Sequence, residues 1–525
     1  MQRDFLLNRL KQNPDKQWDI VVIGGGATGL GIAVDAASRG YETVLFEQSD
    51  FAKGTSSRST KLVHGGVRYL AQGDVSLVLE ALHERGLLRQ NAPHLVKNQA
   101  FIIPNYDWWE GPFYNIGMKV YDMMAGRLGL GPSEKISREE TIKAIPNLDE
   151  NHLNGGVIYY DGQFDDSRLA INLAQTAVEN EAIVLNYMTV TGLLKDRHSL
   201  LCGVEVTDVE SGDNYTVRSK VVINATGVFV DNILSMDDAG ADALVRPSQG
   251  IHFVLDKSFL QGDSAIMIPK TSDGRVLFAV PWHGKVVVGT TDTPLEPGEI
   301  SLEPRALEEE INFILTTAAR YLKKIPQKKD VLSVFAGLRP LAAQQDGQTQ
   351  STKEISRSHR LMVSVSGLIT ITGGKWTTYR KMAEDTVNKA WMVGGLPQRK
   401  CVTETMPIHG YVKNTCFDSP GYYYGSDRSA INGMIQTKPD LGQLLHPDYE
   451  YTRALVVWAV HNEMARTVED FLSRRIRMLL LDARASMAMA PEVADIMARE
   501  LKRDPAWIQA QVTGYLALAK GYILS

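Results

Sequence analysis

The chain has 525 residues, of which 44% are hydrophobic and 22% are charged, so it can bury more than one core and is not intrinsically disordered. Its 56 basic and 61 acidic residues give a formal net charge of −5, which argues against broad nucleic-acid binding. Three scattered cysteines, Cys202, Cys401 and Cys416, do not support a disulfide framework or a cysteine-rich metal cluster, so we expect a reducing cytoplasm and no metal.

The sequence does not predict a membrane span. Charged residues break every apolar run before it reaches about 18 residues, and residues 1–16 lack the apolar core of a secretory signal. Peripheral attachment to a membrane stays open.

Residues 19–47 predict one βαβ unit, in which a crossover helix joins two parallel strands. The apolar run D-I-V-V-I is followed by the turn Gly24-x-Gly26-x-x-Gly29, a helix of small residues and the run E-T-V-L-F-E. The first glycine permits a tight turn, the second lets the backbone approach a pyrophosphate, and the third brings helix and strand together. Glu47, at the end of the second strand, can accept hydrogen bonds from ribose hydroxyls. The unit therefore predicts dinucleotide binding.

The next segment favours FAD over NAD as the dinucleotide. Residues 51–70, F-A-K-G-T-S-S-R-S-T-K-L-V-H-G-G-V-R-Y-L, place hydroxyls and two glycines directly after the second strand, which suits a long cofactor laid across the domain. Because a second Gly-x-Gly-x-x-Gly does not follow another strand, we expect no separate nicotinamide site. His64 could contact the flavin or cap a turn. The candidate cofactor contacts here are Thr55, Ser56, Ser57, His64, Gly65 and Gly66.

Residues 108–121, W-W-E-G-P-F-Y-N-I-G-M-K-V-Y, are rich in aromatic side chains and are flanked by Lys119 and Arg127. Such a segment can seat a protein on a membrane surface, but it can also pack against its own domain.

The strand K-V-V-I-N-A-T-G at 220–227 matches the first βαβ unit, so the nucleotide-binding domain is predicted to be discontinuous. Residues 236–370 contain alternating strand patterns, for example at 276–280 and 285–289, and predict a mixed sheet that faces the substrate. We assign to the nucleotide-binding domain residues 15–95, 150–235 and 355–395, and to the substrate domain residues 96–149 and 236–354.

Residues 372–383, T-G-G-K-W-T-T-Y-R-K-M-A, combine glycines, cations and hydroxyls at a predicted helix start. Unpaired N–H groups and the helix dipole favour an anion there. The anion can be the pyrophosphate of the cofactor or a phosphate of the substrate.

Residues 400–525 predict a mainly helical domain. A loop-rich linker at 407–450 precedes helical patterns at 454–480, 490–502 and 504–519. Pro491 suits the start of the second of these helices. We expect the side chains of Arg474, Arg475 and Arg477 to lie on a solvent-exposed face of a helix.

Four stretches together resemble one known family. They are I-G-G-G-A-T-G-L-G-I-A-V-D-A-A-S-R-G at 23–40, T-S-S-R-S-T-K-L-V-H-G-G-V-R-Y-L at 55–70, A-G-L-R-P-L at 336–341 and G-G-K-W-T-T-Y-R-K-M-A at 373–383. The family is the FAD-dependent glycerol-3-phosphate dehydrogenases. Leu30, where that family usually has a small residue, departs from the pattern but leaves the binding glycines intact. The resemblance extends over nearly the whole chain through 224–227, 289–292 and 463–475.

The resemblance implies an α/β fold with a Rossmann-like FAD domain of the glutathione-reductase type. This domain is interleaved with a mixed-sheet substrate domain like that of D-amino-acid oxidase, and a helical domain follows. The implied reaction is oxidation of sn-glycerol 3-phosphate to dihydroxyacetone phosphate, with the C2 hydride passing to flavin N5 and the electrons to a membrane quinone or to oxygen. A cytoplasmic protein held peripherally on the inner face of the membrane fits this reaction, and a homodimer is compatible with it.

Individual roles also follow from the resemblance. The implied phosphate contacts are Arg68, Tyr69, Lys375 and Thr378. Beside the reacting C2 hydroxyl it places His252 and Arg339. Because the first glycine turn already provides for the pyrophosphate, we expect the turn before Lys375 to face the flavin ring. The further implied cofactor contacts are Thr226, Gly227, Asp292, Gly373 and Gly374.

These residue types suit the implied chemistry. Arginine can bind phosphate oxygens bidentately, and lysine acts as a point charge. A neutral histidine can take the hydroxyl proton as the hydride leaves, and an arginine can stabilise the alkoxide. Plainer roles stay open as well: His252 can be a core histidine, Arg339 can tether the loop before Pro340, and Asp292 can serve a turn.

Two other functions stay open on the same fold. An FAD-dependent amine or amino-acid oxidase would bind a carboxylate and would need no phosphate pocket with a lysine. A non-catalytic flavin-binding scaffold or sensor would hold a flavin that no small substrate reduces.

Overall fold

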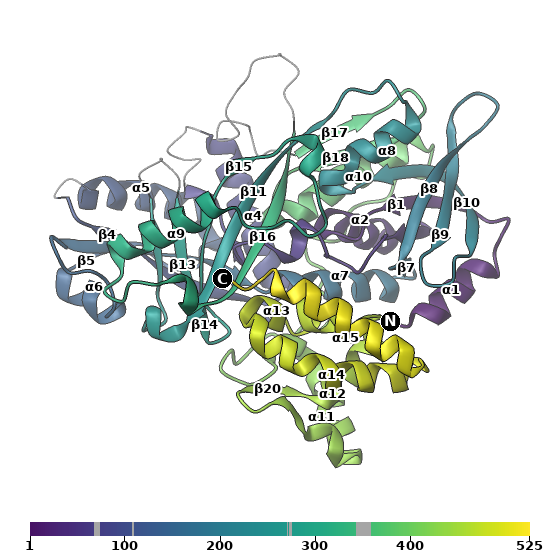
Figure 1. The fold of residues 1–525 in the computed structure, drawn as a ribbon. Coiled ribbons are helices and arrows are strands. Elements are labelled where there is room, and N and C mark those ends of the chain that lie inside the picture. The colour runs from purple at the N-terminus through teal and green to yellow at the C-terminus, as the bar shows by residue number, and fades with distance from the viewer. Residues whose placement is uncertain (68–73, 108–109, 270, 272–275, 343–358, 525) are drawn as a thin grey trace.

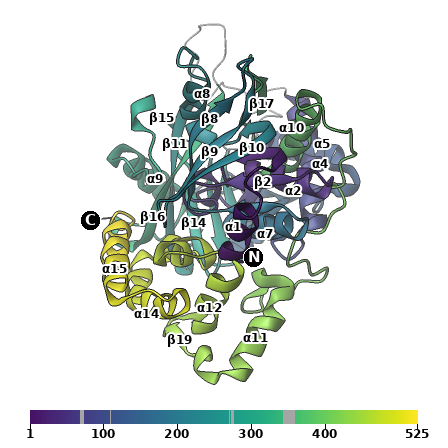
Figure 2. The same ribbon diagram turned by 90° about the vertical axis from the view of Figure 1, so that its right-hand side faces the viewer.

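The structure is a computed structural model that describes residues 1–67, 74–107, 110–269, 271, 276–342 and 359–524. Two β-sheets with flanking helices form the larger part of the molecule, and a helical domain lies at one end (Figure 1). A view turned by 90° places α12, α14 and α15 again at the end opposite to β17 and α8 (Figure 2).

The first sheet has the strand order β17-β18-β10-β1-β2-β7, and its strands from β18 to β7 are parallel. The expected βαβ unit is confirmed as β1 (Gln17–Ile23), α2 (Ala27–Ser38) and β2 (Thr43–Phe46). The matching strand is confirmed too, because β10 (Asn214–Asn224) pairs in parallel with β1. The other elements are β7 (Ile183–Leu185), β8 (Met188–Lys195), β9 (Leu201–Asp208), β17 (His359–Val363), β18 (Ile369–Gly373), α1 (Arg3–Lys11), α7 (Asp166–Glu179), α8 (Val230–Asp237) and α10 (Tyr379–Val393).

Small residues let α2 pack against both α7 and α10, and this contact fixes the start of α2 beside the ends of β1 and β10. Gly31 shows how close the helices are, since a Cβ there would lie 2.8 Å from the ring of Tyr379 on α10. The carboxyl ends of the parallel strands therefore meet at one edge, which is where open α/β sheets bind ligands.

The second sheet has the order β15-β11-β14-β13-β12-β4-β6-β3, with β16 on β11 and β5 on β6. The expected mixed sheet is confirmed, because β12 is parallel to β4 while the other pairs are antiparallel. Its strands are β3 (Leu62–Val63), β4 (Val96–Asn105), β5 (Glu134–Ile136), β6 (Gly155–Phe164), β11 (Val245–Asp256), β12 (Ala265–Ile268), β13 (Leu277–Trp282), β14 (Lys285–Gly289), β15 (Thr293–Pro294) and β16 (Val331–Ala342).

One boundary differs from the sequence-based assignment. The strand β6 pairs along its whole length with β4, so it belongs to the second sheet, although residues 150–235 were assigned to the nucleotide-binding domain. The alternation of apolar residues in β6 fits either sheet, and pairing alone decides between them.

Helices cover the second sheet. The helices α4 (Val75–Asn91) and α5 (Glu110–Ala125) share an apolar cluster with β4 and β6, to which Leu82, Tyr121, Phe101 and Tyr159 contribute. A separate cluster joins β11 and β14 to α9 (Glu308–Tyr321). The short helix α6 (Arg138–Ala144) begins with a capping box formed by Ser137 and Glu140.

The C-terminal domain is mainly helical, as expected, but its helices begin and end elsewhere. Its elements are α11 (Arg428–Thr437), β19 (Leu444–His446), β20 (Tyr449–Thr452), α12 (Arg453–Asn462), the π-helix Asp470–Arg475, α13 (Met478–Leu481), α14 (Ala483–Leu501) and α15 (Pro505–Lys520). The prediction of one helix over 454–480 is wrong, because Met464 and Arg477 take left-handed backbone angles that interrupt it. Pro491 lies inside α14 and not at its start, since Asp482 caps that helix through the N–H of Ala485.

The expected solvated face with Arg474, Arg475 and Arg477 is also wrong. All three side chains are buried, and carboxylates of other segments pair with them, among them Asp50 and Asp165. Burial of an unpaired guanidinium would be costly, so these ion pairs specify how the C-terminal domain docks.

Among the described residues, no helix combines the length and the apolar character that crossing a bilayer requires.

Candidate functional site

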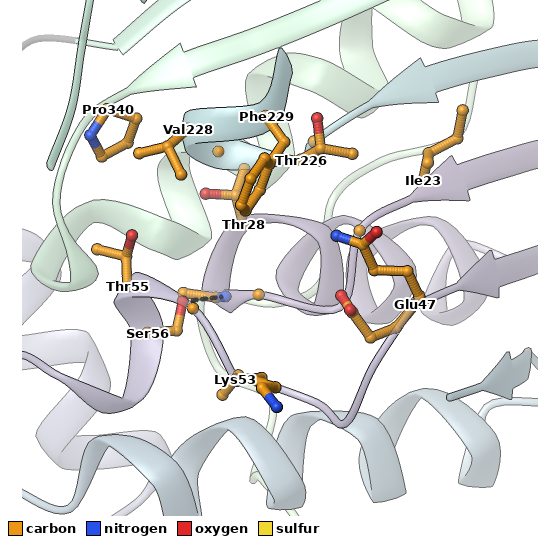
Figure 3. Close-up of a pocket in the computed structure, with 18 of the residues that line it drawn as sticks. Ile23, Thr28, Glu47, Lys53, Thr55, Ser56, Thr226, Val228, Phe229 and Pro340 are labelled. Atoms are coloured by element: carbon orange, nitrogen blue, oxygen red, sulfur yellow. Dashed lines mark hydrogen bonds between the residues drawn. The ribbon is translucent and has the colours of Figure 1, made fainter. Parts of the chain in front are cut away.

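A cavity of about 330 Å³ lies at the carboxyl edge of the first sheet (Figure 3). The turn between β1 and α2, the loop after β2 and the residues after β10 form most of its wall. Thr55, Ser56, Glu47, Thr226 and Phe229 surround it in the close-up. We call it the first cavity.

The glycine turn has the geometry that a pyrophosphate requires. Gly24 has φ +110°, and a Cβ there would lie 2.6 Å from the carbonyl oxygen of Ala225. A Cβ on Gly29 would lie 1.9 Å from the carbonyl oxygen of Gly24, so Gly29 brings α2 close to the strand without lining the cavity. Gly26 is the N-cap of α2 and lines the cavity. The positive end of the helix dipole and its N–H groups therefore face the space where an anion would bind.

Glu47 lies beside the glycine turn in the wall of this cavity, where it could reach the ribose of a bound dinucleotide. Its carboxylate accepts hydrogen bonds from the N–H of Gly25 at 2.6 Å and of Ser49 at 2.9 Å. Burial raises the pKa of Glu47, while the two N–H groups favour its ionised form. A carboxylate has further lone pairs, so hydroxyl groups can still bind to it.

Most of the other predicted cofactor contacts line the first cavity too. The hydroxyl of Ser56 accepts the N–H of Ala27 at 2.9 Å, and that of Thr55 donates to the carbonyl of Leu338 at 2.6 Å. Ser57 does not line it; its carbonyl accepts the ammonium of Lys61. The predicted contacts that line the cavity are Gly24, Gly26, Glu47, Thr55, Ser56, Thr226, Gly227, Gly373 and Gly374.

A second cavity, of about 170 Å³, adjoins the first at Arg339, which lines both. Three predicted cofactor contacts, His64, Gly66 and Asp292, line this second cavity and not the first. Gly65 lines neither, because Leu82 and the hydroxyl of Tyr121 fill the space where its side chain would lie. The described lining also includes Thr60, Leu62, Val67, Phe101, Tyr159, Asp161, Met267, Val276, Phe278, Thr290 and Thr291.

Arg339 is held in place at the junction of the cavities. Its guanidinium donates to the hydroxyl of Thr290 at 3.1 Å and to the carbonyl of Thr291 at 2.9 Å. It also lies 3.4 Å from the carboxylate of Asp292, which in turn accepts the hydroxyl of Ser248. A fixed cation between a cofactor and a substrate can stabilise negative charge that develops on either.

His252 on β11 lies behind the wall of the second cavity and does not line it in the described structure. Its Nε2 lies 2.9 Å from the hydroxyl of Thr60, which does line the cavity, and its ring stacks on Phe335. Burial, and then the positive charges of Arg339 and Lys61, lower the pKa of His252 well below 6.5. The ring is therefore neutral near pH 7 and can accept a proton through Thr60.

The predicted phosphate contacts are not brought together by the described residues. Lys375 lines the first cavity, beside Gly373 and Gly374. Thr378 lines neither cavity, because it is buried at the start of α10, where its hydroxyl contacts the carbonyl of Lys375 at 3.3 Å. Arg68 and Tyr69 lie outside the described residues.

One group of residues at the second cavity was not predicted from the sequence. Asp161 on β6 lines it, and its carboxylate accepts the guanidinium of Arg85 at 2.6 Å and the hydroxyl of Tyr121 at 2.9 Å. The same hydroxyl accepts the N–H of Gly65 at 2.8 Å. Burial raises the pKa of Asp161, and Arg85 opposes that rise. An acid inside the strand-like run V-I-Y-Y-D-G-Q-F was the available signal.

Comparison with known proteins agrees with this geometry. The model of a family described as FAD dependent oxidoreductase matches residues 19–380. A second model, the C-terminal domain of alpha-glycerophosphate oxidase, matches residues 369–508. The pairing of the two models fits the two sheets and the helical domain described above.

Single relatives cover most of the chain. Human mitochondrial glycerol-3-phosphate dehydrogenase is 39% identical over 530 residues, which cover 94% of this chain and 72% of that protein. Its counterpart from Schizosaccharomyces pombe is 38% identical and covers 93% of this chain and 85% of that protein. The crystal structure of a Bacillus halodurans glycerol-3-phosphate dehydrogenase complexed with FAD has a TM-score of 0.79 at 29% identity, covering 99% of this chain and 97% of that one.

The fold and the first cavity thus define an FAD-dependent oxidoreductase. Within that class, the chain belongs to the family of FAD-dependent glycerol-3-phosphate dehydrogenases. The residues fit FAD: the glycine turn leaves room for a pyrophosphate, Glu47 can bind a ribose, and Gly373 and Gly374 can lie against a flat ring.

Proposed function

We propose that this chain oxidises sn-glycerol 3-phosphate to dihydroxyacetone phosphate with FAD as the hydride acceptor. The observation that carries the proposal is Arg339, which lies where the cofactor cavity meets a second cavity. Relatives that match 93–94% of this chain are glycerol-3-phosphate dehydrogenases by name, and that name supplies the substrate.

The chain's own residues would position the substrate and handle its charge. As the C2 hydroxyl gives up its proton, negative charge grows on the C2 oxygen, and Arg339 can stabilise it because its guanidinium is already fixed by Thr291 and Asp292. Exclusion of water by a substrate that fills this cavity of about 170 Å³ would strengthen the effect.

The proton of the C2 hydroxyl needs an acceptor. We assign that role to His252, acting through the hydroxyl of Thr60, which would donate to Nε2 while it accepts from the substrate. The lowered pKa of His252 keeps the ring neutral and ready to accept.

The phosphate needs cations at the other end of the substrate. The residues that we propose to contact the phosphate are Arg68, Tyr69, Lys375 and Thr378. The ammonium of Lys375 would act as a point charge that attracts the phosphate dianion. Because Lys375 lines the first cavity, the phosphate that it contacts would lie next to the flavin.

The electrons must then leave the flavin, and we propose a membrane quinone as their acceptor, with oxygen as the alternative. Support comes from α5, whose exposed Ile116, Val120 and Met123 lie at helical spacing on one face, with exposed fractions of 66%, 41% and 81%. Such a stripe suits peripheral contact with the inner face of a membrane. Flotation with vesicles should fail for a variant with serine at all three positions, and sizing of the wild type would test the proposed homodimer.

Anaerobic titration of the FAD-loaded protein tests the reaction itself. Glycerol 3-phosphate should bleach the flavin absorbance, and glycerol should not do so at the same concentration, because it lacks the phosphate. Bleaching by D-amino acids instead would favour an amine or amino-acid oxidase. A flavin that none of these compounds reduces would favour a scaffold or sensor. Reoxidation of the reduced protein by a soluble quinone or by air then separates the two acceptors.

A further inference from the structure

The C-terminal domain contacts the loop that carries part of the cofactor cavity. The π-helix Asp470–Arg475 ends in two consecutive arginines, and both reach one carboxylate. Arg474 Nε lies 2.5 Å from Asp50, and Arg475 donates two hydrogen bonds to it, at 2.7 and 2.9 Å. All three side chains are almost completely buried. π-helical turns are rare and often occur at functional sites.

Asp50 lies in the middle of the loop 47–54, between β2 and the short helix at Thr55–Ser57. Other residues of this loop, Glu47, Gln48, Ala52, Lys53 and Gly54, line the first cavity. The side chain of Asp50 itself is fully buried and is bound to the C-terminal domain. One face of the loop thus belongs to the cofactor site, and the other is held by a different domain.

A second ion pair ties the same loop to the same π-helix. Glu469, which precedes the π-helix, accepts Lys53 at 2.9 Å and Arg474 at 2.9 Å. Lys53 lines the first cavity, so the contact reaches a residue of the cavity wall directly (Figure 3). Attachment at both Asp50 and Lys53 restricts the orientation of the loop 47–54 as well as its distance from the π-helix.

The buried charges allow little freedom in this arrangement. Burial alone would raise the pKa of Asp50, but Arg475 and Arg474 hold it below its usual value, so the carboxylate stays ionised. Moving the loop away from the π-helix would leave the buried carboxylate of Asp50 without both of its arginines, which is costly. These ion pairs therefore favour the observed position of the loop, and that position shapes the wall of the cavity.

We propose that the C-terminal domain is part of the FAD-binding machinery, with Arg474 and Arg475 acting through Asp50 as positioning residues for the loop 47–54. FAD binding and docking of the C-terminal domain are then coupled, so each stabilises the other. The proposal concerns cofactor binding and does not depend on which substrate the protein oxidises.

Asp50→Asn tests this coupling, and Asp165→Asn is its matched control. Asp165 is also buried and also pairs with an arginine of the C-terminal domain, Arg477, at 2.8 Å. The neighbours of Asp50 in the loop 47–54 line the first cavity, whereas none of the residues 162–168 around Asp165 does. Reconstitution of each apoprotein with FAD should give a Kd at least about tenfold higher for Asp50→Asn and within about threefold of wild type for Asp165→Asn. Equal Kd values for Asp50→Asn and wild type, or an equal rise in both variants, would overturn the proposal.

Hydrogen exchange on the wild-type protein gives a readout that does not require any variant to fold. FAD should slow exchange at residues 464–481, although none of these residues lines the first cavity. Residues 428–437 of α11 serve as the internal reference, because this helix lies at the far end of the same domain (Figure 1). Equal protection of 464–481 with and without FAD would refute the coupling.

Discussion

The two cavities are built from different kinds of groups. The first is lined mainly by apolar side chains, glycines and hydroxyls, such as Phe229, Gly24 and Ser56, and its charged residues are a small share of the lining. Charged residues are a larger share of the second, where Arg85 holds Asp161 and Asp292 holds Arg339 from other elements. Shape therefore governs the first cavity, and paired charge governs the second. Substitutions in the first should prevent cofactor binding, whereas those in the second should slow the reaction of a protein that still holds FAD.

The largest effect should come from Gly24→Ala. The new Cβ would lie 2.6 Å from the carbonyl oxygen of Ala225, and φ of +110° disfavours any residue with a side chain. We expect purified protein without bound flavin, measured as the ratio of flavin to protein absorbance. Gly433→Ala is the control, because its Cβ would meet nothing within 4 Å. Normal flavin content in Gly24→Ala would show that the turn can accommodate a side chain at this position without loss of FAD binding.

Arg339→Met should slow flavin reduction by glycerol 3-phosphate by about 10²- to 10³-fold, because the developing alkoxide loses its cation. Anaerobic stopped-flow measurement on FAD-loaded protein reads this step directly. The substitution also leaves Asp292 without its ion pair. The double variant Arg339→Met with Asp292→Asn removes that complication, and recovery of the wild-type rate in it would assign the loss to the stranded carboxylate.

His252→Gln should slow flavin reduction by about 10²-fold. If the proton passes through Thr60, Thr60→Val should give a similar loss, and the double variant should be hardly slower than either single one. A wild-type rate in Thr60→Val would instead require direct contact between His252 and the substrate.

The pH dependence of the same step follows from the lowered pKa of His252. A base with a depressed pKa stays neutral until the pH falls below that value, so the acid limb of the rate profile should lie below pH 6.5. Arg339 is one cause of the depression. The residual rate of Arg339→Met should therefore lose activity at a higher pH than wild type, and an acid limb above pH 6.5 in the wild type would contradict this assignment.

Much of the first cavity could be predicted from the sequence, because its determinants are local. The spacing of Gly24, Gly26 and Gly29 between a strand and a helix encodes the turn within six residues. The second cavity was predicted only in part. Arg339 was assigned through the family resemblance, whereas Asp161 and its partner Arg85, 76 positions apart, escaped notice.

The buried arginines show why the rest could not be read from the sequence. Arg474 and Asp50 are 424 positions apart, and three arginines within four residues have the same composition as a solvated helix face. Two of their partners, Asp50 and Asp165, come from other parts of the chain, so burial depends on a docking that local patterns do not encode. The misplaced start of α14 has a more local cause, since Asp482 was an available capping residue eight positions before the predicted start at residue 490.

Lys375→Ala tests whether a residue of the first cavity can serve the substrate. Lys375 lines the first cavity, but we assign it to the phosphate of the substrate. We expect KM for glycerol 3-phosphate to rise about tenfold or more, since a phosphate dianion loses a point charge, with a smaller change in the Kd of FAD. Steady-state kinetics and apoprotein reconstitution measure the two quantities separately. The opposite split, weaker FAD binding with KM unchanged, would place Lys375 in the cofactor site alone.

Tyr121→Phe should have the smallest effect, and it tests whether paired groups around the second cavity also set its shape. The hydroxyl joins Asp161 to the N–H of Gly65, so its loss frees the turn that carries His64 and Gly66 into the cavity wall. We expect a stability loss of about 1–2 kcal/mol and a rise in KM of only a few-fold, with FAD content unchanged. Tyr159→Phe is the matched control, because its buried hydroxyl contacts the weak acceptor Met267 and holds no turn. If both variants raise KM equally, the effect belongs to the loss of a hydroxyl near the cavity and not to the Gly65 turn.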